Sequence, residues 1–196
     1  IIKQIKNPIC TELTIHKAAE NGQLEMVKWL YKNTRIPCDA KPMDRAARQG
    51  HLDIVKWLHE NYEGCTTDAM DYAEANGHLE VVKFLHHKRT EGCTYNAIDN
   101  AAKNGHLDTI KWLHENTYKR CTTWAMDRAA LNGHLEIVKW LHENRTEGCT
   151  TDAMDWAAMC GHLDVVKFLH ENRKEGCTYN AIDNAAKNGH LDIVKW

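Results

Sequence analysis

Residues 149–176 read CTTDAMDWAAMCGHLDVVKFLHENRKEG, and nearly all of the remaining chain is built from copies of this unit. Self-similarity at a fixed period of this size is typical of a solenoid, in which each repeat packs mainly on its neighbours. The one shorter copy has lost a residue between Gly50 and Cys65, in a predicted connecting loop. The register is set by Gly22, Gly50, Gly77, Gly105, Gly133, Gly161 and Gly189, and by Cys10, Cys38, Cys65, Cys93, Cys121, Cys149 and Cys177, both spaced by 28, 27, 28, 28, 28 and 28 residues.

Length and charge fit one elongated domain rather than several globular ones. The chain has 196 residues, a formal net charge of −2 and a pI of about 6.7. It contains no run of like charge, no Pro- or Ser-rich linker and no apolar stretch approaching the roughly 18 residues of a membrane span. The sequence predicts a single array over residues 1–196, with repeats at 10–37, 38–64, 65–92, 93–120, 121–148, 149–176 and a partial one at 177–196.

Both ends of the chain look like interrupted repeats. Residues 1–9 align with the tail of a preceding repeat, and the chain stops inside the second half of the last one. Neither end carries the polar capping repeat that solenoids use for solubility. We expect the chain to be a segment of a longer protein.

Each repeat predicts two short helices, called helix A and helix B below. In the third repeat, Thr66 or Thr67 can cap the start of helix A, and Gly77 can adopt the left-handed conformation that ends it. Helix B then runs over about residues 78–87. Its expected core residues are Leu79, Val81, Val82, Phe84 and Leu85, and the equivalent Trp140 is likewise expected in the core.

Residues 129–139, AALNGHLEIVK, strongly resemble the core of the ankyrin repeat. The first half of the family pattern, T-P-L-H, is matched more loosely, with its Pro only as Pro42 and its His only as His16. The unit is about five residues shorter than the common repeat of about 33. The resemblance implies an all-α solenoid of stacked helix-turn-helix repeats, with the β-hairpins reduced to tight turns, and a function in protein binding. At the family's His position the chain has Asp44, Asp71, Asp99, Asp127, Asp155 and Asp183.

Comparing the repeats with one another locates a candidate binding surface. The third, seventh and tenth residues after each cysteine vary, while most of helix A is constant. These positions share the outward face of helix A, and Trp124 and Trp156 among them are of the residue types that dominate binding hot spots. Drift of exposed positions, or inheritance through duplicated three-repeat blocks, is the alternative explanation. The predicted partner-binding residues, called the helix A surface below, are Lys41, Arg45, Arg48, Asp68, Tyr72, Asn96, Asn100, Lys103, Trp124, Arg128, Leu131, Asp152, Trp156, Met159, Asn180, Asn184 and Lys187.

The eight cysteines are expected to be reduced. Equivalent residues on stacked layers lie roughly 8–10 Å apart, beyond the span of a disulfide. Reduced thiols indicate an intracellular protein, cytoplasmic or nuclear. Cys160, outside the repeat pattern, is the one thiol expected to be partly exposed.

No metal or cofactor site is predicted. Eleven of the thirteen histidines fall on two repeat positions, and single ligands a layer apart are not expected to converge on one ion. The histidine after each repeat's glycine is expected to bond backbone across the turn.

Nothing in the sequence suggests an enzyme, because no catalytic constellation breaks the repeat. Binding of nucleic acid is the main alternative to protein binding, since Arg45, Lys103 and Arg128 share the surface with aromatic residues. Asp68 and Asp152 interrupt the basic residues of this surface, and the net charge of −2 gives no attraction to phosphate. Both observations count against nucleic-acid binding. A purely structural spacer is the remaining alternative. No membrane association and no obligate oligomer are implied.

Overall fold

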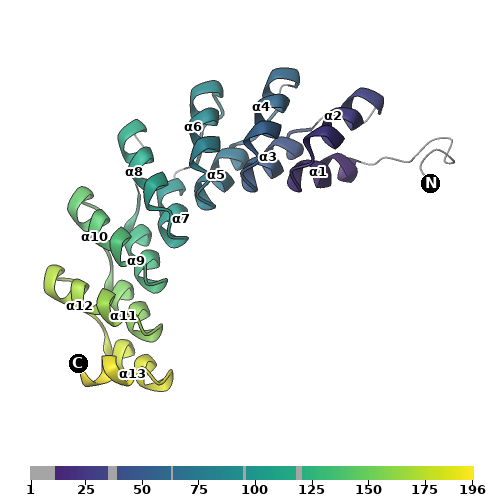
Figure 1. Ribbon diagram of the computed structural model, residues 1–196. Helices are drawn as coiled ribbons and strands as arrows, with labels where there is room; N and C mark the ends of the chain where they lie inside the picture. The colour runs from purple at the N-terminus through teal and green to yellow at the C-terminus, as the bar shows by residue number, and fades with distance from the viewer. Residues whose placement is uncertain (1–11, 35–38, 63, 95, 118–120) are drawn as a thin grey trace. The chain divides into compact units, whose positions relative to one another are not determined.

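The computed structural model describes residues 12–34, 39–62, 64–94, 96–117 and 121–196, which form fourteen α-helices and no strand (Figure 1). The predicted all-helical fold is confirmed, and no β-hairpin separates successive repeats in this part of the chain. The A helices are α1 (Glu12–Glu20), α3 (Lys41–Arg48), α5 (Thr67–Ala75), α7 (Ala97–Lys103), α9 (Thr123–Leu131), α11 (Thr151–Met159) and α13 (Tyr179–Lys187). The B helices are α2 (Leu24–Asn33), α4 (Leu52–Asn61), α6 (Leu79–Lys88), α8 (Leu107–Asn116), α10 (Leu135–Asn144), α12 (Leu163–Asn172) and α14 (Leu191–Lys195).

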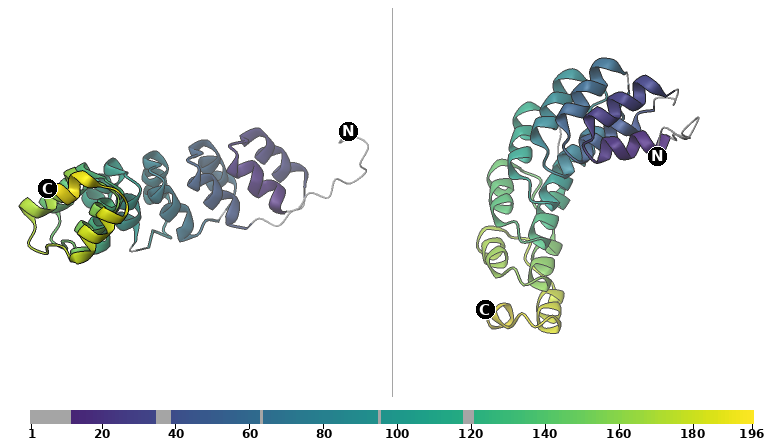
Figure 2. Two further views of the ribbon diagram at one scale, coloured as in Figure 1. Left: turned by 90° about the horizontal axis from the view of Figure 1, so that it is seen from below. Right: turned by 45° about the vertical axis from the view of Figure 1, so that its right-hand side comes forward.

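The helices belong to two compact units, Ile1–Cys93 and Thr94–Trp196. In the first unit, α1, α3 and α5 pack side by side in chain order, and each also packs on its own helix B. In the second, α7, α9, α11 and α13 form the same kind of row, with the B helices beside them (Figures 1 and 2). Within each unit, one row is therefore made of A helices and one of B helices.

The helix ends follow the predicted signals. The Thr66 hydroxyl accepts a hydrogen bond from the Asp68 N–H at 3.1 Å and so caps α5. At the other end Gly77 has a φ of 73°, and the His78 N–H donates to the Ala73 carbonyl at 2.9 Å. This left-handed closure satisfies carbonyls that the end of a helix otherwise leaves open, and it turns the chain into helix B.

The core lies between the two rows of helices. Ala73 on α5 is fully buried, and its small side chain lets neighbouring A helices approach closely. On α6, Val81, Val82 and Leu85 are at most 2% exposed. The expectation that Leu79 and Phe84 are also buried is wrong, because both side chains are only partly covered. They lie at the border of the core.

Trp140 also lies at the border of the core. The expectation that it is a core residue is therefore wrong as well. The indole is only partly buried, and its ring lies T-shaped to the His114 ring at a centroid distance of 5.2 Å. The equivalent Phe168 meets His142 in the same T-shaped arrangement at 5.6 Å. A histidine in the last turn of one helix B thus packs on the aromatic ring of the next helix B, a favourable geometry for two aromatic rings.

Cys65, Cys121, Cys149, Cys160 and Cys177 are free thiols. The prediction that Cys160 is the one exposed thiol is wrong, because Cys177 is exposed as well. Cys121 and Cys149, by contrast, are buried under the loops of their own repeats.

Candidate binding surface and contacts between repeats

None of the seventeen residues of the helix A surface is buried. The third position after each cysteine is exposed throughout, from Lys41 to Asn180. At the seventh position of this surface the side chains are partly covered, except for that of Tyr72, which is exposed. At the tenth position the lysine side chains are exposed, whereas those of Leu131 and Met159 are partly covered. Varied side chains are therefore presented from successive A helices within each unit.

In the first unit these residues line a pocket of about 260 Å³. The Arg45 guanidinium donates to Glu20 at 3.0 Å, and Arg48 lies over the Tyr72 ring at 5.0 Å from its centroid. A hydrogen bond from Lys17, with a further contribution from Arg45, lowers the pKa of the Glu20 carboxyl. The pocket therefore combines fixed charges of both signs with an aromatic face. Its lining residues are Glu20, Lys41, Asp44, Arg45, Arg48, Asp68 and Tyr72.

In the second unit the surface is more apolar at its centre. Trp124 is 56% exposed, and the Arg128 guanidinium lies over its ring at 4.2 Å. Leu131 ends the same helix, and Trp156 and Met159 on α11 are partly exposed. An exposed indole under a guanidinium is typical of sites that bind a partner. Asn and Lys side chains occupy the equivalent positions of α7 and α13, at Asn96, Asn100, Lys103, Asn180, Asn184 and Lys187.

The aspartates at the family's His position bind successive repeats together, a role that the sequence analysis did not assign. The Asp127 carboxylate accepts from the Thr150 N–H at 2.8 Å and from its hydroxyl at 3.0 Å. Burial raises the pKa of this carboxyl above its ordinary value, although the two Thr150 bonds oppose the change. The same pair of bonds joins Asp44 to Thr66, Asp99 to Thr122 and Asp155 to Thr178.

The first repeat has the same contact with the residue types exchanged. His16 stands at the aspartate position, and its Nε2 lies 2.9 Å from an oxygen of Asp39, which stands at the threonine position. A hydrogen-bonding pair is thus kept although both residues differ.

The histidine after each repeat's glycine does bond to backbone, but not across its own turn as expected. His134 Nε2 lies 3.2 Å from the Lys103 carbonyl oxygen, and His190 Nε2 lies 3.1 Å from that of Met159. His51 and His78 contact the carbonyls of Glu20 and Arg48 in the same way, each at 3.0 Å. The imidazole therefore contacts the end of helix A of the preceding repeat. The tenth position after the cysteine, which belongs to the helix A surface, lies at this helix end.

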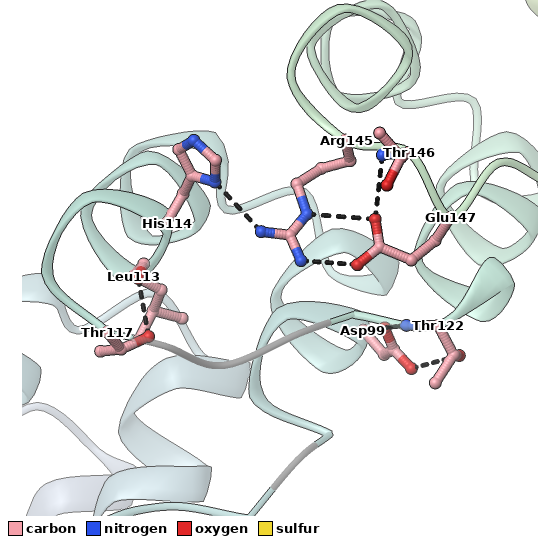
Figure 3. A network of polar contacts seen from close by, with 8 residues as sticks. All are labelled: Asp99, Leu113, His114, Thr117, Thr122, Arg145, Thr146 and Glu147. Carbon is pink, nitrogen blue, oxygen red and sulfur yellow. Dashed lines mark hydrogen bonds and ion pairs between the residues drawn. The ribbon is translucent and has the colours of Figure 1, made fainter.

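A second network joins the loop that follows a helix B to the helix B of the preceding repeat (Figure 3). Arg145 donates to both oxygens of Glu147, at 2.6 and 3.3 Å, and its other terminal nitrogen lies 3.1 Å from Nδ1 of His114 on the preceding repeat. Arg173 makes the equivalent contacts with Glu175 and His142. The network covers the repeat's cysteine, and burial raises the pKa of the Cys121 thiol to about 11 although Arg145 opposes the change.

One cluster breaks the repeat. Carboxylate oxygens of Asp71 and Glu74 and the sulfur of Cys93 lie within 4.8 Å of one another. Asp71 and Glu74 belong to the third repeat and Cys93 begins the fourth, so three side chains with metal-ligating chemistry meet across a repeat boundary. The signal was present in the sequence, since every other repeat has alanine at the position of Glu74.

Comparison with known proteins agrees with this architecture of paired helices in a repeat array. Family models for ankyrin repeats match residues 15–59 (many copies) and residues 69–155 and 126–196 (three copies). The chain therefore belongs to the ankyrin repeat family, whose repeats are generally protein–protein interaction modules. The crystal structure of the human ASB11 ankyrin repeat domain is similar in fold, with a TM-score of 0.69 and 20% identity over 92% of this chain and 96% of that one.

The search of curated proteins found no match. Among the residues that the structure describes, no helix is both long enough and apolar enough to span a membrane.

Proposed function

We propose that this chain is a non-enzymatic interaction module that binds a partner protein through its helix A surface. The observation that carries the proposal is the exposed Trp124 ring under the Arg128 guanidinium, beside partly exposed Leu131. Exposing a large apolar side chain to water is unfavourable, and burying it against a partner is favourable. Trp and Arg are also the residue types whose truncation most often abolishes binding.

The pocket of the first unit supports a protein partner over a nucleic acid. It holds Lys41, Arg45 and Arg48, but also the carboxylates of Glu20 and Asp68. Phosphate backbones require a surface of one sign, whereas protein surfaces offer both. We therefore place a nucleic-acid partner second, and a spacer without a partner third.

We further propose that residues 1–196 form one array in an intracellular protein. The family models match from residue 15 to 59 and from 69 to 196, which supports continuity of the repeats. The free thiols of Cys121 and Cys149 support a reducing compartment.

Site-specific crosslinking tests the proposal. A photoreactive amino acid is placed at position 124 on helix A or at position 139 on helix B of the same repeat, and both chains are irradiated in extract from the source cells. We expect one protein to crosslink through position 124 alone, and purified Trp124→Ala chain to bind that protein more weakly than the wild type. Equal crosslinking from position 139 contradicts the assignment of the surface, and a crosslink to nucleic acid from position 124 favours the second function.

A further inference from the structure

The third repeat carries a buried carboxylate where the other repeats have a methyl group. Glu74 is 0% exposed, at the ninth position after its repeat's cysteine. A carboxylate removed from water is costly unless it is neutralised or coordinated, so such a residue needs a specific compensation. The equivalent residues are Ala19, Ala47, Ala102, Ala130, Ala158 and Ala186.

The surroundings of Glu74 supply two further groups that bind metals. Asp71 lies one turn earlier on α5, and Cys93 begins the next repeat. One ligand atom from each of these residues and from Glu74 lies within 4.8 Å of the other two. The cluster therefore offers two carboxylate oxygens and one sulfur around a single point.

The regular architecture explains why these residues meet. In the other repeats the aspartate also reaches the start of the next repeat, and Asp127 acts electrostatically on the Cys149 thiol. Those sites have an aspartate and a cysteine but only Ala130 in place of Glu74. The third repeat thus completes, with one substitution, a set of ligands that the scaffold holds partly assembled elsewhere.

We propose that Asp71, Glu74 and Cys93 bind a divalent transition-metal ion, for which Zn²⁺ is the best fit. Zinc accepts thiolate sulfur at about 2.3 Å and carboxylate oxygen at about 2.0–2.2 Å, so its ligand atoms are separated by roughly 3–4 Å. The three ligand atoms lie within 4.8 Å of one another, so coordination requires them to move closer together. Mg²⁺ and Ca²⁺ are disfavoured because they prefer oxygen alone.

Binding would neutralise most of the charge of the cluster. The Cys93 thiol loses its proton when it coordinates the ion, so the three ligands carry three negative charges against two positive ones. Three protein ligands leave the fourth position of a tetrahedral ion for water. The ion ties α5 to the beginning of the next repeat, which adds its binding free energy to the stability of the folded chain.

The test uses the full chain, freed of metal by a chelator and then titrated with Zn²⁺ or Cd²⁺. We expect one equivalent to bind, an ultraviolet thiolate-to-Cd²⁺ charge-transfer band to appear, and Zn²⁺ to raise the thermal midpoint. Glu74→Ala restores the residue of the other repeats, so it is expected to fold. Loss of a group that only supports a metal ligand typically weakens metal binding by about 10–100-fold. Glu74→Ala removes a ligand itself, so it should weaken Zn²⁺ binding by at least this factor.

Matched variants separate this site from binding by the surface histidines. Cys93→Ser should abolish the charge-transfer band, whereas Cys149→Ser, at a cysteine whose preceding repeat has Ala130 in place of the glutamate, should leave it unchanged. After the chelator has removed the metal, Glu74→Ala should be more stable than the wild type. Addition of Zn²⁺ should remove or reverse that difference in stability. The proposal is overturned if Glu74→Ala binds Zn²⁺ as tightly as the wild type, if the band survives Cys93→Ser, or if wild-type stability does not respond to Zn²⁺.

Discussion

The Asp127 carboxylate on α9 accepts two hydrogen bonds from Thr150 at the start of α11, one from the N–H at 2.8 Å and one from the hydroxyl at 3.0 Å. Because Asp127 is 2% exposed, water cannot readily replace these bonds. Asp127→Ala should therefore lower the free energy of unfolding by about 1.5–3 kcal/mol, the range for hydrogen bonds to a charged group. Urea unfolding measures the change. Asp152→Ala, which removes an exposed carboxylate from the first turn of α11, is the control and should cost less than about 1 kcal/mol; equal losses would contradict the role of Asp127.

The loop network should make stability depend on pH through Glu175. A hydrogen bond from Arg173 lowers the pKa of the Glu175 carboxyl to about 2, from 4.5. Because the folded state binds the proton less tightly than the unfolded state, the stabilisation is complete above pH 4.5 and is lost as the pH falls towards about 2.

We therefore expect Glu175→Gln to cost about 1–2 kcal/mol at neutral pH, after allowance for solvent screening of a carboxylate that is 28% exposed. The difference from the wild type, measured by denaturant unfolding across the acid range, should shrink towards pH 2. A difference that stays constant over this range would mean that the ion pair does not cause it.

The glycine before each repeat's histidine should tolerate alanine poorly for two reasons. Gly133 has a φ of 72°, and a Cβ there would lie 2.6 Å from the His162 ring. Gly176 has a similar φ of 69°, but a Cβ there would meet nothing within 4 Å. Gly176→Ala should cost only the backbone term, about 1–2 kcal/mol. Thermal unfolding should show a clearly larger loss for Gly133→Ala, and equal losses would exclude a contribution from His162.

The cysteines should divide by reactivity in the native state. Cys160 and Cys177 are exposed, whereas Cys149 is buried and burial raises the pKa of its thiol to about 11. Because the thiolate is the reactive form, native alkylation at pH 8 should label the first two rapidly and Cys149 slowly. Mass spectrometry of timed samples follows each site. Rapid labelling of Cys149 in the folded chain would contradict the burial of this residue.

The sequence predicted the parts of the fold that depend on local pattern. The repeat period, the threonine cap at Thr66 and the left-handed Gly77 all follow from neighbouring residues. The contacts between Asp127 and Thr150 could not be predicted in this way, because the two residues are 23 positions apart and belong to different repeats. Whether an aromatic such as Trp140 is core or border also depends on the adjacent repeat, through His114.

The candidate surface was easier to locate than the cluster around Glu74. Variation between repeats identifies exposed positions directly, and none of the residues selected in this way is buried. The same comparison could have singled out Glu74, since it is the one departure from alanine at its position. Spacings of His and Cys alone do not indicate the cluster, because Asp71 and Glu74 lie on a repeat different from that of Cys93.

The affinity of the crosslinked partner for three tryptophan variants tests the central claim most directly. Trp124→Ala and Trp156→Ala should each weaken binding by about 2 kcal/mol or more, as hot-spot residues do. For Trp124→Ala, thermal stability should stay within about 0.5 kcal/mol of the wild type, because more than half of the side chain is exposed.

Trp140→Ala on the B row should behave in the opposite way. Its partly buried ring packs on His114, so its loss should lower stability by about 2–3 kcal/mol, less than the 3–5 kcal/mol of a fully buried Trp, while partner affinity is retained. The decisive measurement is partner affinity by calorimetry for folded Trp124→Ala and Trp140→Ala chains. The account predicts that only Trp124→Ala loses affinity; unchanged affinity for Trp124→Ala, or an equal loss for both variants, would contradict binding through the helix A surface.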